Sequence, residues 1–164
     1  MSGNVDPVAV ATLNLTSSGN ISSIGGAVLG AGTLNLDAGA SINLQTAANT
    51  LSFAAAGNVM IFELDALDLD GNSAGGSVDV ETSSGELTVT SAGVSAATTL
   101  ELVGGSSVSG SLTTIGDVSG TSVTLAGRDG VSLGGNIDAS AAAGQLFLTA
   151  PNTAITETRG SIDA

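Results

Sequence analysis

The chain lacks most of the residue types on which binding and catalytic sites depend. Its 164 residues include no Cys, Trp, Tyr or His, and the only two basic residues are Arg128 and Arg159. Without cysteine there is no disulfide framework and no thiolate metal site. A phosphate-binding surface needs Lys and Arg, so with 15 acidic residues and a net charge of −13 we expect no nucleic-acid partner.

Charge of either sign is also scarce. Charged residues make up 10% of the chain and apolar residues 42%, whereas a disordered chain has the opposite bias. Only Phe53, Phe62 and Phe147 are aromatic, so the core must consist of medium-sized aliphatic side chains in many thin layers.

The uncharged stretch 38–62 alternates and is interrupted by polar residues, which is not typical of a membrane-spanning helix, so we expect no membrane insertion. The first ten residues lack the basic and apolar regions of a signal peptide.

A short apolar–variable–apolar pattern returns throughout the sequence. A two-residue period predicts a strand with one buried face. The outward residues would include Asn14, Asn35, Asp68, Glu101 and Thr124. The clearest copies lie at 12–15, 33–36, 50–53, 66–69, 86–89, 99–102, 122–125 and 145–148, and weaker ones at 42–44, 59–61, 78–80 and 131–133.

These triplets recur about every eight residues, and we place further ones at Val108 and Ile115. Gly, Asn, Asp and Ser between them supply sharp corners. Three strands and three corners make a coil of about 23 residues. Leu102, Leu125 and Leu148 are spaced by 23 residues, and so are Val108 and Val131. Ile137 and Ile162 are 25 residues apart. The sequence thus predicts an all-β, right-handed parallel β-helix with about three short strands per coil and about seven coils.

Two other fold classes fit less well. An antiparallel sandwich has longer strands, usually buries some aromatic residues and would not repeat one position at the coil period. Helices are disfavoured by the two-residue period and by the 24 glycines. We therefore interpret 1–164 as a single β-helix domain with a less regular start over 1–32. The uncapped strand pattern at 160–164 suggests a fragment of a longer protein.

Three segments carry a resemblance to a known family. The runs 122–140, 145–150 and 33–39 resemble the repeats of filamentous-haemagglutinin-like adhesins, the exoproteins of two-partner secretion and autotransporter systems in Gram-negative bacteria. The resemblance covers most of the chain from about residue 33 onward. It implies a right-handed parallel β-helix, secretion to the cell surface and adhesion to host or environmental glycans or proteins. It transfers no functional residue to this chain.

The densest acidic stretch, 63–72 with Asp79 and Glu81, is the main candidate site. Outward carboxylates can bind Ca²⁺, but the calcium-loop pattern beginning at Asp68 has Ser73 and Asp79 where Gly and Glu are required. Whether the stretch around Asp68 and Asp70 binds calcium stays open. The same carboxylates can serve glycoside cleavage, but the aromatic and basic residues that hold sugars are nearly absent. We therefore assign no catalytic, cofactor-binding or metal residue.

Two surface features are weaker. Thr-x-Thr pairs at 88–90 and 156–158 resemble ice-binding motifs but do not recur at the expected coil period. Phe147 is expected to point outward, where a lone aromatic can mark a lateral contact.

The favoured function is a structural or adhesive rod segment of a secreted surface protein, without enzymatic activity. One alternative is a β-helix that binds or cleaves polysaccharides, which a groove lined by carboxylates on consecutive coils would favour. Another is a fibre subunit that associates with like subunits end to end through uncapped coils.

Overall fold

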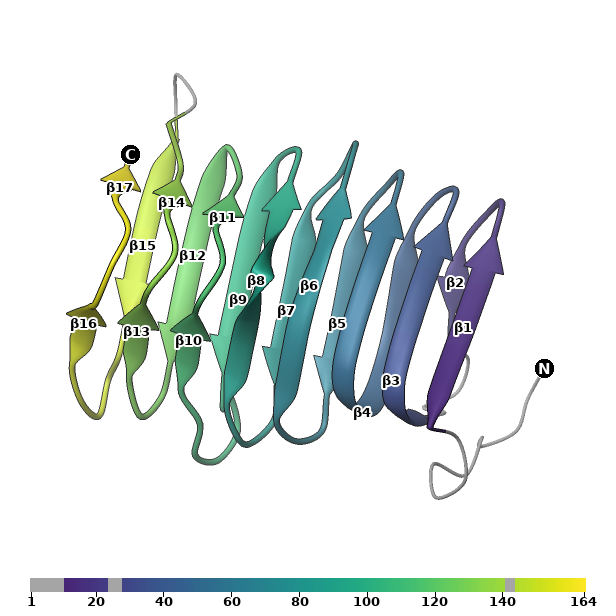
Figure 1. Ribbon diagram of the computed structural model, residues 1–164, viewed down its shortest axis with the longest axis horizontal. Coiled ribbons are helices and arrows are strands. Elements are labelled where there is room, and N and C mark those ends of the chain that lie inside the picture. Colours follow the sequence, from purple (N-terminus) through teal and green to yellow (C-terminus); the bar gives the residue numbers. More distant parts are fainter. Residues whose placement is uncertain (1–10, 24–27, 141–143) are drawn as a thin grey trace.

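The computed structural model describes residues 11–23, 28–140 and 144–164, which form a β-solenoid of parallel strands (Figure 1). These ranges contain no helix, and so none that could cross a membrane. The strands are β1 (Thr12–Ser17), β2 (Ile21–Ser22), β3 (Val28–Ala38), β4 (Ile42–Ala55), β5 (Val59–Glu63), β6 (Leu67–Ser73), β7 (Val78–Thr82), β8 (Leu87–Ala96), β9 (Thr99–Gly104), β10 (Leu112–Thr114), β11 (Val118–Ser119), β12 (Ser122–Gly127), β13 (Val131–Leu133), β14 (Ile137–Asp138), β15 (Gln145–Thr149), β16 (Ile155–Glu157) and β17 (Ile162–Asp163).

The strands stack into two ladders, here called face A and face B. Face A joins β1, the second halves of β3 and β4, β6, β8 and then the pairs β10/β11, β13/β14 and β16/β17. Face B joins β2, the first half of β4, β5, β7, β9, β12 and β15. The chain runs up the near face and down the far one while advancing from β1 to β17, which is the right-handed sense (Figure 1). The predicted fold is confirmed, with about seven coils.

Coil length varies more than the sequence suggested. Leu102, Leu125 and Leu148 are neighbours on face B, as predicted. Adjacent positions elsewhere lie between 17 residues apart, as for Ile42 and Val59, and 25 apart, as for Ile137 and Ile162. Three short strands per coil are found in the C-terminal half. In the N-terminal half, β3 and β4 are long strands that continue from one face to the other.

The prediction of strands at Val108 and Ile115 is wrong. Both side chains are exposed, at 61% and 58%, and the strands begin instead at Leu112 and Val118. Val131 pairs with Leu112, so its spacing of 23 from Val108 has no structural meaning. The physical reason is a long turn after β9: the Ser107 and Val108 amides donate to the Ser83 carbonyl, so this segment stacks on the previous coil's turn.

The less regular start predicted for 1–32 falls partly outside the described residues. Within the described part, β1 pairs with β3 in register over its whole length, from Thr12 with Thr33 to Ser17 with Ala38.

The core is a stack of aliphatic rows between the two faces. Leu34, Leu51 and Leu69 form one row on face A, and Ile61, Val80 and Leu102 one on face B; all are at most 1% exposed. Burying rows of medium-sized side chains across every coil gives a continuous hydrophobic core without aromatic layers. The core is largely apolar, and its buried polar exceptions include three side chains at one corner: Thr46, Glu63 and Thr82.

Candidate functional site

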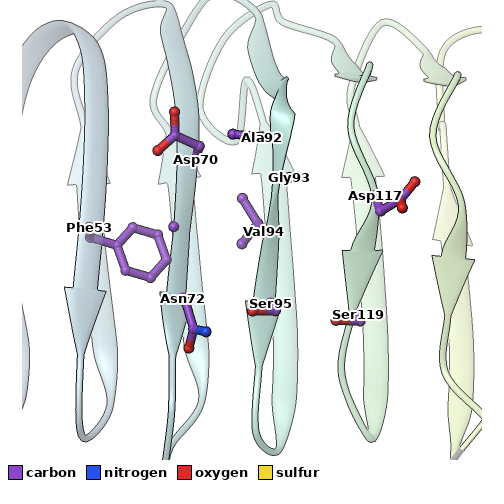
Figure 2. Close-up of a pocket in the computed structure, with 10 residues that line it drawn as sticks. Phe53, Asp70, Asn72, Ala92, Gly93, Val94, Ser95, Asp117 and Ser119 are labelled. Atoms are coloured by element: carbon purple, nitrogen blue, oxygen red, sulfur yellow. The ribbon is translucent and has the colours of Figure 1, made fainter.

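An open groove of about 380 Å³ lies on face A (Figure 2). It arises where β8 is longer than β6: Leu69 pairs with Val89 but Gly71 pairs with Val94, so 90–93 bulge out of register. In the next coil the same face is divided into β10 and β11. The groove is lined by Phe53, Asp70, Gly71, Asn72, Ala92, Gly93, Val94, Ser95, Asp117 and Ser119.

The two carboxylates of the groove are both engaged in structural hydrogen bonds. Asp70 Oδ2 accepts from Thr90 Oγ1 at 3.3 Å, and Asp117 Oδ1 accepts from the Asn136 amide at 2.8 Å. They lie on either side of β8, and the Asp117 carboxyl group is directed away from Asp70 (Figure 2). Glycoside cleavage needs two carboxyl groups that face one substrate. The groove therefore has two acidic residues, but they are two coils apart instead of on consecutive coils, and they lack the geometry of an acid–base pair.

The acidic stretch is divided among three directions. Asp68 and Asp70 lie on β6 in face A, Asp79 and Glu81 lie on β7 in face B, and Glu63 is inside the core. The four carboxylates on β6 and β7 point outward, as the alternation predicts, but they do not form one patch. Within the described ranges, no three Asp, Glu, His or Cys side chains lie close enough to hold a metal ion. Burial, and secondarily the Glu81 carboxylate, raises the pKa of Asp79.

A row of hydroxyl side chains runs along face A, and the sequence analysis missed it. Thr88 and Thr156 both belong to this row, although the coils between them contribute Thr113 and Ser132 and no Thr-x-Thr pair. Coils of unequal length and the interruption at Asp68 conceal the row in the sequence. In register order it comprises Thr12, Thr33, Thr50, Asp68, Thr88, Thr113, Ser132 and Thr156.

Short polar side chains connect successive coils, both along face A and at the corners. The Asn35 side-chain amide donates to Asn14 Oδ1 at 2.7 Å. Asp117 accepts from the Asn136 amide, and Asn136 Oδ1 in turn accepts from the Ser161 amide at 3.1 Å. Such ladders satisfy turn amides that no strand partner reaches. They account for much of the Asn and Asp content without a ligand.

The buried corner residue Glu63 is the other feature that the sequence analysis overlooked. Its carboxylate is fully buried and accepts three hydrogen bonds: from Thr46 Oγ1 at 2.7 Å, the Ala48 amide at 3.0 Å and the Leu64 amide at 2.8 Å. Burial outweighs these hydrogen bonds and raises the pKa of Glu63. The signal was present in the sequence, because Glu63 continues the inward alternation of Val59 and Ile61.

Phe147 lies on face B with half of its surface exposed, as predicted. No protein-family model, no curated protein and no solved structure matches the chain.

Proposed function

We propose that this chain is a structural or adhesive rod segment of a secreted bacterial surface protein, without catalysis. One observation carries the proposal: polar groups that lie outside the core are used to tie coil to coil. Asp117, Asn136 and Asn35 all make hydrogen bonds across adjacent coils. This pattern is what a stiff scaffold requires, because each coil is held by its neighbours.

The surface location and the adhesive role rest on the resemblance of 122–140 and 145–150 to haemagglutinin-like repeats. The partners are host or environmental glycans or proteins. Support comes from register: the two resembling runs contain β12 and β15, which lie on adjacent coils with Leu125 over Leu148. The repeats that carry the resemblance are therefore also the repeats that build the rod.

Polysaccharide binding, without cleavage, is the second candidate. The groove on face A and the hydroxyl row beside it favour this function. An extended sugar chain presents hydroxyl groups at regular intervals, and hydroxyl side chains on stacked strands repeat about every 4.8 Å.

A glycan array and a turnover assay on acidic polysaccharides distinguish the two candidates. A rod whose adhesion is to proteins gives no array signal and no turnover. Polysaccharide binding is supported if the double variant Thr88→Val/Thr113→Val loses the array signal. The face B variant Thr124→Val should keep that signal. Turnover of any polysaccharide contradicts both candidates.

A further inference from the structure

Glu63 occupies a position where a charge is costly. It lies at the corner where β5 ends, in an inward row between Thr46 of β4 and Thr82 of β7. All three side chains are 0% exposed. The only basic side chains of the chain, Arg128 and Arg159, follow β12 and β16, at least three coils away. Among the described residues, the ionised carboxylate therefore has no basic side chain as a counter-ion.

The partners of Glu63 accommodate the protonated form as well as the ionised form. In the ionised state Oε2 accepts from Thr46 Oγ1 and the Ala48 amide, and Oε1 accepts from the Leu64 amide. When a proton binds Oε2, the Thr46 hydroxyl oxygen can accept it, because a hydroxyl both donates and accepts. The two amides keep their acceptors. Protonation thus removes the buried charge and preserves the contacts of the corner.

We propose that Glu63, Thr46 and the amides of Ala48 and Leu64 form a proton-controlled latch that joins β4 to β5. The latch is tightest when Glu63 is protonated, and it loosens when the carboxyl group ionises. The rod is therefore locally stiffer below the pKa of Glu63 than above it.

The surrounding charges act in the same direction. Strand β4 contains no titratable residue, and the side chains of β7 that can ionise, Asp79 and Glu81, lie in outward positions. Asp65, two residues after Glu63, is the neighbouring carboxylate that adds repulsion. Desolvation is the larger effect, and both disfavour the ionised form.

The sign of the pH effect follows from thermodynamic linkage. Because the pKa of Glu63 is raised above the ordinary value of 4.5, the folded corner binds the proton more tightly than the unfolded chain does. The stabilisation is complete below pH 4.5 and is lost as the pH rises through the pKa of the folded state.

Two measurements on the uniformly ¹³C,¹⁵N-labelled full chain test the latch: the Glu63 carboxyl ¹³C shift and amide-exchange protection, each recorded from about pH 4 to about pH 8. We expect Glu63 to titrate above 4.5. Protection of Ala48 and Leu64 should fall over the same interval, by a factor of about ten for each unit by which the pKa is raised. The Gly76 amide, which is bound by Ser73 Oγ at 3.1 Å, serves as the internal reference.

Two variants with the same change of charge complete the design. Glu63→Gln cannot ionise, so its protection at Ala48 and Leu64 relative to Gly76 should no longer depend on pH. Glu101→Gln, at an exposed position of face B, should keep the fall seen in the parent chain. The latch is refuted if Glu63 titrates at or below 4.5, or if the fall persists in Glu63→Gln. If Glu63→Gln does not fold, the parent chain alone still tests the latch. Protection of Ala48 and Leu64 that stays constant while Glu63 titrates would refute the latch.

Discussion

Phe53 and Gly71 are neighbours in one inward row of adjacent coils, and the Phe53 ring occupies the space that a side chain on Gly71 would fill. Figure 2 shows the ring directed from β4 toward β6. Gly71 also has φ of +152°, which disfavours other residues. The one aromatic side chain of the buried core is thus accommodated by a missing side chain in the next coil.

Gly71→Ala should therefore lower the free energy of unfolding by about 1–3 kcal/mol through overpacking. Urea denaturation measures the loss. Gly19→Ala is the control, since a Cβ there meets only Ser17 Oγ at 3.9 Å, and its effect should stay within about 0.5 kcal/mol. In a Phe53→Leu background the Gly71→Ala cost should shrink by at least about 0.5 kcal/mol. Simple additivity of the two changes would show that the ring and the glycine are not coupled.

Thr82→Val should destabilise the corner next to β9. Thr82 Oγ1 accepts from the Gly105 amide at 2.9 Å inside the core, and valine keeps the shape of threonine without the acceptor. An unpaired buried amide costs about 1–3 kcal/mol. Thermal and urea unfolding report the change, and Thr88→Val, in an outward position, should be nearly neutral. Equal effects of the two substitutions would show that the buried hydroxyl contributes nothing special.

Asp117 should act as a hydrogen-bond acceptor and not as a catalytic acid. Asp117→Ala leaves the Asn136 amide without its side-chain partner and should cost about 0.5–1.5 kcal/mol of stability. Asp117→Asn keeps an acceptor oxygen and should recover most of that loss. If instead Asp117→Asn abolished a measurable turnover of polysaccharide while leaving stability unchanged, the groove would be an active site.

Calcium should not stabilise the fold. Asp68 and Asp70 lie on a different face from Asp79 and Glu81, so no site collects the acidic stretch. A ligand present at one hundred times its Kd would add about 2.7 kcal/mol to the unfolding free energy. We expect the melting temperature in Ca²⁺ to equal that in Mg²⁺ at matched ionic strength. A rise specific to Ca²⁺ would reveal a site built from carboxylates.

The inward positions were predictable because burial imposes a strict two-residue alternation. Leu100, Leu102, Val123 and Leu125 all follow it and are fully buried. The alternation fails to predict where a strand begins after a long turn. Val108 and Ile115 are apolar and lie near the expected spacing, yet the turn after β9 leaves both exposed. Nothing in a local pattern measures how many residues a corner will take.

The outward rows and the buried carboxylate were harder to predict for a related reason. Which side chains share a row depends on the summed lengths of all corners between them. Thr88 and Thr156 align only through Thr113 and Ser132. Charge normally indicates exposure, so the composition of 63–72 predicts a surface position for Glu63, although its position in the alternation of β5 is inward.

The most direct test of the account is a spin-label distance series along one outward row of face B. Asn43, Met60, Asp79, Glu101, Thr124 and Phe147 are consecutive members of that row. Labels on introduced cysteines at Asn43 and Glu101 should lie about 14 Å apart, and labels at Asn43 and Phe147 about 24 Å apart, because neighbouring strands are separated by about 4.8 Å. This increase of about 10 Å is the result that stacked parallel coils predict. Distances that do not increase from Glu101 to Phe147 would contradict the solenoid, and with it every functional proposal made for its faces.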